Sequence, residues 1–180
     1  MRYHGTMKPV DPASLEWGYT RAFRVARTRD SRPSPSAEMG KWISFLPASM
    51  PQDRRLEVFD GLASKVLADP ALASRVCQAK MAMQPLAIAP DDIALMFYCE
   101  QGDKQLVLPA LRRLARSHRA PLLQSGDLKA RDGYLGGWAF KTDAQTRDEI
   151  RQGTHVAQVS LMMELLDLTS PGAARRSPRP

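Results

Sequence analysis

The sequence predicts an α+β protein with a curved, mostly antiparallel sheet and helices packed on one face of that sheet. The main observation is the order of patterns between residues 40 and 150, which reads strand, helix, strand, strand, helix, strand. The second is composition, because 43% hydrophobic and 25% charged residues in 180 are typical of a globular domain. We expect one domain over residues 39–169, a basic and partly disordered arm over 1–38, and a disordered basic tail over 170–180.

The first half of the predicted domain contains segments with the periodicity of a strand and one segment with the periodicity of a helix. Residues 40–46, GKWISFL, form a strand that Pro47 ends, and residues 51–68 place Leu56, Phe59 and Val66 near one helical face. Residues 75–83 alternate with period two, as a strand requires. Residues 92–100, DIALMFYCE, are almost continuously apolar, which predicts a central strand covered on both faces.

The second half of the predicted domain contains a helix, a short strand, a helix or turn, and a last apolar stretch. Residues 103–119 are predicted as a helix with Asp103 at its N-cap, and residues 136–141, GGWAFK, as a short strand among glycines. Residues 142–150 begin a helix or turn with Thr142 or Asp143 as its cap. The last apolar stretch, residues 155–168, fits either a helix or a buried edge strand.

Positive charge is concentrated at the two ends of the chain. Residues 1–41 hold eight basic and four acidic residues, residues 171–180 add three arginines, and residues 42–170 are neutral overall. A flexible basic segment neutralises phosphates on nucleic acid, whereas the alternative is a pair of solubilising termini. The candidate nucleic-acid residues of the arm are Arg21, Arg24, Arg27, Arg29 and Arg32.

Several classes of protein do not fit the sequence. No apolar run approaches the roughly 20 residues of a membrane helix, and the N-terminus lacks a secretory pattern, so we expect a cytoplasmic protein without a membrane span. Cys77 and Cys99 lie in apolar stretches and are expected to be buried thiols. We therefore expect no metal site and no cofactor.

Three segments resemble a known family in order and approximate spacing: GKWISFL, IALMFYCEQGDKQLVLPALRRL and FKTDAQTR. They are similar to the poorly characterised phosphothreonine-lyase-like domains that include the basophilic leukemia expressed protein. The resemblance covers roughly residues 39–147 and is carried by Gly40-Lys41-Trp42 and Lys141-Thr142-Asp143. Phe140 replaces the family's tyrosine, and its aromatic-glycine pattern is missing after Arg147. The resemblance implies a fold like that of the cap-binding translation initiation factor.

The family name implies an enzyme that removes phosphate from phosphothreonine by β-elimination. Such chemistry needs a base for the α-proton, an acid for the leaving phosphate and cations that hold it. Lys80 is the candidate base, since apolar neighbours favour the neutral amine. None of the three histidines, His4, His118 and His155, takes a convincing position for the acid.

The function that we prefer from the sequence is non-catalytic binding of phosphate-bearing ligands, either RNA or nucleotides. In this hypothesis Trp42 or Trp138 stacks on bases while lysines hold the phosphates. Strand alternation, however, turns Lys41 and Trp42 to opposite faces, and likewise Trp138 and Lys141, so a bulge at Gly136 and Gly137 would be needed to join them. The candidate ligand-binding residues are Lys41, Trp42, Trp138, Lys141, Thr142, Asp143 and Arg147.

Two further alternatives stay open at this point. Tryptophans in strands are more often core anchors than stacking platforms, and Lys141-Thr142-Asp143 is also explained as a helix cap beside a solvated lysine. The methionine-rich residues 160–166, in turn, could dock a protein partner.

Overall fold

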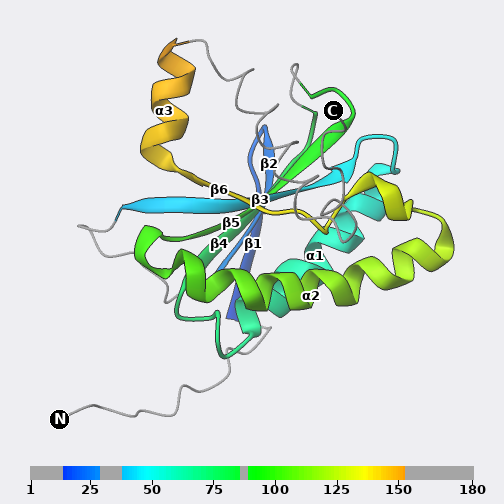
Figure 1. Ribbon diagram of the computed structural model, residues 1–180, viewed down its shortest axis with the longest axis horizontal. Helices are drawn as coiled ribbons and strands as arrows, with labels where there is room; N and C mark the ends of the chain where they lie inside the picture. The colour runs from blue at the N-terminus through cyan, green and yellow to red at the C-terminus, as the bar shows by residue number, and fades with distance from the viewer. Residues whose placement is uncertain (1–13, 29–37, 86–88, 153–180) are drawn as a thin grey trace, which may run out of the picture.

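The computed structural model describes residues 14–28, 38–85 and 89–152, and these residues form an α+β fold around one antiparallel sheet (Figure 1). The sheet has six strands in the order β1-β2-β4-β5-β3-β6 and is not closed. Every neighbouring pair is antiparallel. The strands are β1 (Leu15–Tyr19), β2 (Phe23–Thr28), β3 (Met39–Pro47), β4 (Val76–Ala82), β5 (Asp92–Glu100) and β6 (Ala139–Thr142).

The helices complete the predicted order. They are α1 (Gln52–Ala68), α2 (Lys104–Ser125) and α3 (Asp143–Gln152). From β3 onward the chain therefore runs strand, helix, strand, strand, helix, strand and a final helix, as the periodicities predicted. The longest apolar run became β5, which lies between β4 and β3 with its first six residues buried.

Helices α1 and α2 lie side by side on one face of the sheet (Figure 1). Between them and the strands lies the core, in which Phe59 of α1, Leu111 of α2 and Phe97 of β5 have no exposed surface. We call the sheet face against α1 and α2 the helix face, and the opposite one the outer face. Because side chains alternate along a strand, each strand divides its residues between these two faces.

The start of the sheet corrects the predicted domain boundary near Met39. Residues 15–28 form the hairpin β1–β2, and β2 pairs with β4 from Phe23 to Arg27. Ala26 is fully buried, and the Trp17 ring meets Phe59 of α1 edge-on at 6.5 Å between centroids. Much of the predicted arm is thus part of the sheet. Residues 29–37, 155–168 and 170–180 lie outside the described residues, so the expected tail and the Met-rich stretch are not described.

Strand β6 approaches β3 closely at one point. A Cβ atom on Gly40 would lie 2.8 Å from Cε1 of Phe140 and 3.0 Å from the backbone oxygen of Lys141. Glycine therefore permits the Phe140 ring to cross the end of β3. The same ring contacts Trp42 edge-on at 5.2 Å between centroids.

Candidate functional site

The candidate site is built on the outer face by residues that lie opposite one another across five strands. In β3, Lys41 is paired with Tyr98 of β5 on one side and with Lys141 of β6 on the other. Tyr98 is paired in turn with Gln78 of β4, and Gln78 with Arg27 of β2. Since paired residues project to the same face, these five side chains form one row.

A third lysine joins this row from the next position along β4. Lys80 lies two residues beyond Gln78, on the same face, and its Nζ is 4.9 Å from the centre of the Tyr98 ring. The Lys41 Nζ lies 5.4 Å from the same ring centre. Both ammonium groups are within cation-π distance of one tyrosine. Lys41, Lys80 and Lys141 are called the lysine cluster below.

The lysine cluster is unusually buried for cationic side chains. Only 7% of Lys41 and 5% of Lys141 are exposed, whereas Lys80 is half-buried. Burial, followed by the nearby charge of Lys41, lowers the pKa of Lys141 to about 8. The same two causes lower the pKa of Lys80, while the charge of Asp143 acts in the opposite direction. The protein therefore holds these cations close together at a cost, which an anion would reduce.

One carboxylate approaches the lysine cluster from the start of α3. Asp143 Oδ1 accepts a hydrogen bond from Lys41 Nζ at 3.1 Å. In the part of the chain that the structure describes, no carboxylate forms an ion pair with Lys80. Burial and the charge of Asp143 raise the pKa of Tyr98 to about 12, so its hydroxyl stays protonated at neutral pH.

Asp143 is held in place by a reciprocal cap at the β6–α3 junction. The Thr142 hydroxyl accepts a hydrogen bond from the backbone N–H of Gln145 at 3.1 Å, and the Gln145 side chain accepts one from the backbone N–H of Thr142 at 2.8 Å. This is a capping box. The predicted role of Thr142 as a helix cap is confirmed. The cap fixes the position at which β6 ends, and thereby the first residue of α3, Asp143.

Two adjoining hollows extend along the outer face. The smaller has a volume of about 340 Å³ and is lined by Lys80, Tyr98 and Asp143, with Arg27, Cys77 and Gln78 around them. The larger, of about 660 Å³, reaches β1 at Glu16 and Gly18 and shares Arg27, Gln78 and Lys80 with the first. Their polar and cationic lining suits an anionic, hydrogen-bonding ligand.

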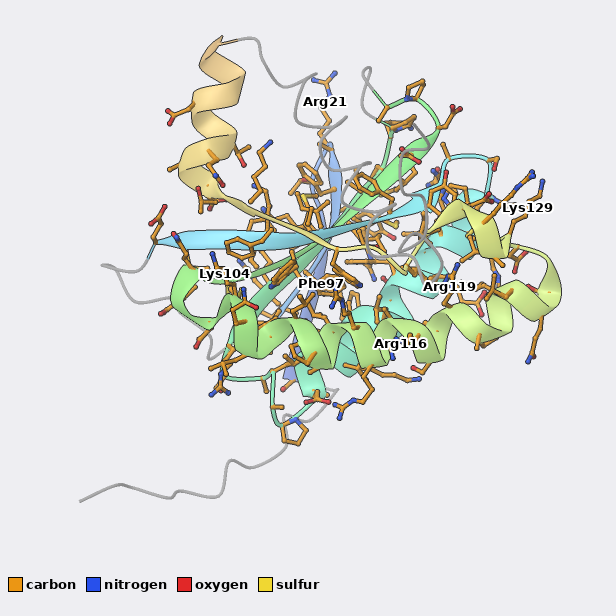
Figure 2. All side chains as sticks on the ribbon, in the orientation of Figure 1. Arg21, Phe97, Lys104, Arg116, Arg119 and Lys129 are labelled. Carbon is orange, nitrogen blue, oxygen red and sulfur yellow. The ribbon has the colours of Figure 1, made fainter. Side chains whose placement is uncertain are left out.

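Trp42 and Trp138 are not part of this lining, whereas Trp17 lines the larger hollow. Trp42 lies on the helix face, is 6% exposed, and donates a hydrogen bond from Nε1 to the backbone oxygen of Lys104 at 3.1 Å. Trp138 is 4% exposed and packs against Phe97, which Figure 2 labels in the core. Neither indole has a face free for a base, so the hypothesis of stacking by these residues is corrected. The alternation that separates Lys41 from Trp42 is confirmed.

The candidate arginines of the predicted arm are distributed over different surroundings. Arg24 belongs to the helix face, where it donates two hydrogen bonds to Asp60 of α1 and lies over the rings of Trp17 and Tyr19. Arg27 is on the outer face and pairs with Glu16 at 2.8 Å. Arg21 is exposed in the turn between β1 and β2.

The remaining sequence candidates are not placed in the site. Arg29 and Arg32 lie outside the described residues. Arg147 falls in α3, and its side chain is outside the described part of the structure.

Sequence reasoning missed Tyr98 and Gln78 as members of the site, and it named Arg27 only as a residue of the basic arm. Tyr98 is the one polar aromatic residue of the apolar run 92–100, which was a signal that it faces something other than the helix layer. Gln78 carried no such signal, and the sequence did not show that Arg27 lies opposite it, because neighbours across the sheet depend on strand order.

Comparisons with known proteins add no assignment. No protein-family model matches the chain, and no curated protein matches it significantly. Among the residues that the structure describes, no helix is long and apolar enough to cross a membrane. The same residues contain no group of His, Cys, Asp or Glu side chains suited to hold a metal ion.

Proposed function

We propose that the outer face binds a phosphate-bearing ligand, a nucleotide or RNA, without transforming it. The observation that carries this proposal is the lysine cluster itself, in which Lys41 and Lys80 approach the Tyr98 ring and Lys141 lies opposite Lys41 on β6. Phosphate oxygens accept several hydrogen bonds and carry the negative charge that would offset the repulsion among these cations. Gln78 and Arg27, one and two strands away from Tyr98, provide further donors for the same ligand.

Affinity is expected to depend on pH through Lys141. Its pKa of about 8 in the free protein would rise when phosphate binds, because the anion favours the charged amine. Binding is therefore strongest below pH 8 and weakens as the pH rises above it. Between the free and bound pKa values the complex takes up a proton, which calorimetry in buffers of different ionisation enthalpy detects.

The test is calorimetric titration of the full chain with a nucleoside triphosphate and with short single-stranded RNA. Lys80→Gln removes one of the two cations that line both hollows, the other being Arg27, and we expect roughly tenfold weaker binding, as for the loss of one charge-assisted contact. Lys65→Gln, at the exposed end of α1, is the matched control and should change nothing. Equal affinity of both variants and the parent would refute the proposal.

A β-elimination activity toward phosphothreonine is the second candidate. The lowered pKa of Lys80 favours it, because a larger fraction of the amine is neutral and able to take the α-proton. In that reaction the C–O bond to phosphate breaks, a Cα=Cβ double bond forms, and phosphate leaves with a proton from an acid. Against it stands the absence, among the described residues of the outer face, of a histidine beside Lys80.

A phosphothreonine peptide separates the two candidates. If the protein is a lyase, it should release phosphate and leave a peptide that is lighter by the mass of phosphoric acid. Neither product should form with Lys80→Ala. If the peptide stays intact after long incubation with the parent protein, the lyase is excluded and binding remains as the candidate function. The protein-interaction alternative concerned residues 160–166, which lie outside the described residues.

A further inference from the structure

A second cationic surface follows α2, in the helix layer. Residues 104–125 contain five Lys or Arg residues and no Asp or Glu. The chain between residues 42 and 170 is neutral only as a sum, because its acidic residues lie outside this helix. The fold thus turns a neutral segment of sequence into a locally positive surface.

Three of the four arginines of α2 share one side of the helix. Positions 112, 116 and 119 are separated by four and three residues, so their side chains neighbour one another. The buried side is taken by Val107, Leu111, Ala115 and Leu122. Figure 2 shows Lys104 near the start of α2, Arg116 and Arg119 along its second half, and Lys129 just beyond its end. We call Arg112, Arg116, Arg119 and Lys129 the α2 strip.

The charge of the α2 strip is not cancelled by neighbouring carboxylates. Arg119 donates hydrogen bonds to the backbone oxygens of Tyr134 at 2.9 Å and Ala130 at 2.9 Å, which hold its guanidinium without neutralising it. Within residues 14–28, 38–85 and 89–152, no ion pair involves Arg112 or Arg116. The adjacent Arg113 differs, because it is paired with Asp69 at 2.7 Å.

We propose that the α2 strip binds the phosphate backbone of nucleic acid without reading its base sequence. Guanidinium groups match phosphate geometry, and several of them along one surface release counterions from a polyanion. Residues 104–125 include no Phe, Tyr or Trp, so stacking on bases is not available from α2. A membrane is disfavoured because the apolar side of α2 is already used in the core.

This proposal does not rest on the lysine cluster. The α2 strip belongs to the helix layer, whereas the lysine cluster is on the outer face, so a mononucleotide at one surface does not reach the other. A long nucleic acid has enough phosphates to contact the α2 strip alone. Failure of either proposal therefore leaves the other standing.

The experiment measures binding of the full chain to a labelled DNA duplex by fluorescence anisotropy over a range of salt concentrations. Arg112→Gln with Arg116→Gln removes two charges, and glutamine keeps a high helix propensity, so circular dichroism should not change. We expect roughly tenfold weaker binding and a slope of log affinity against log salt that is shallower by about 1 to 2. Affinity for a nucleoside triphosphate should be unchanged.

The matched control is Arg21→Gln against Arg116→Gln, since each removes one exposed arginine. Arg21 lies in the β1–β2 turn, far from α2 in Figure 2. Equal weakening by the two variants would mean that only net charge matters, and would overturn the assignment to α2. Absence of duplex binding by the parent protein would overturn it as well. The same holds if anionic vesicles, but not the duplex, respond to the α2 substitutions.

Discussion

At the scale of single residues, Gly40 and Gly18 provide a matched pair. A Cβ on Gly40 would collide with the Phe140 ring and approach the Lys141 backbone, whereas nothing lies within 4 Å of a Cβ on Gly18. Gly40→Ala should therefore lower the free energy of unfolding by about 1 to 3 kcal/mol, the usual cost of overpacking. Gly18→Ala should leave it unchanged or slightly higher. Urea denaturation of both variants checks this, and equal effects would contradict the packing of β3 against β6.

Lys141 makes the second prediction at this scale, for stability against pH. Its folded pKa of about 8 is below the usual 10.5, so the unfolded chain holds that proton more tightly. The resulting destabilisation is fully present at pH 7 and is relieved as the pH rises from about 8 to 10.5. Lys141→Met should raise the melting temperature at pH 7 and flatten the pH dependence in that window. A lower melting temperature in Lys141→Met at pH 7 would show that the ammonium stabilises the fold.

Single residues also mark what the sequence could tell about the site. Alternation in GKWISFL was enough to separate Lys41 from Trp42, because a strand has only two faces. The environment of Lys80 was not deducible, since Phe23 reaches it from a strand remote in sequence and the register that places Tyr98 beside it depends on a bulge in β4. Arg24 lies in a basic segment and was a candidate for nucleic-acid binding, but in the structure it is paired with Asp60. The sequence did not indicate this partner, because the position of Asp60 depends on where α1 crosses the sheet.

At the scale of elements, the capping box connects local structure to the site. Thr142→Ala removes the hydroxyl that accepts the Gln145 N–H and should lower the free energy of unfolding by about 1 kcal/mol, as for other N-cap substitutions. The destabilisation should be largest in α3, because Thr142 caps the first turn of this helix, which also contains Asp143. Amide hydrogen exchange of residues 145–148 measures this directly, and Thr142→Ser is the control that restores the cap. Unchanged exchange in Thr142→Ala would mean that α3 is held by other contacts.

Elements with strong periodicity were predicted well, and those without it were not. The apolar run of β5 and the amphipathic pattern of α1 each had a single interpretation, so the type and position of both elements were predicted. The hairpin β1–β2 was missed because its turn, residues 20–22, contains no Gly, Pro or Asn, and four arginines fall within nine residues around it. Pairing with β4, which decides its structure, is a contact across more than 50 residues.

At the scale of the whole molecule, the hairpin β1–β2 covers the edge of β4 at one end of the sheet. A chain that begins at residue 39 would lose β1 and β2, expose the edge of β4, and uncover Phe59 where Trp17 packs. We expect such a chain to aggregate or to unfold with reduced cooperativity. Size-exclusion chromatography and thermal denaturation beside a chain that begins at residue 14 measure the difference. Equal stability of the two chains would mean that β1 and β2 contribute little to the core.

The burial of Trp42 and Trp138 has a consequence for how ligand binding can be observed. The sequence has three tryptophans, and these two lie against the helix layer, shielded by the sheet from the lysine cluster. Their emission should therefore stay constant while a phosphate-bearing ligand occupies the outer face. Tyr98, which two ammonium groups approach, is the built-in optical reporter, and its near-ultraviolet absorbance should shift on occupancy. Trp17 lines the larger hollow, so a change in indole emission on ligand binding should come from Trp17 and should be lost in Trp17→Phe.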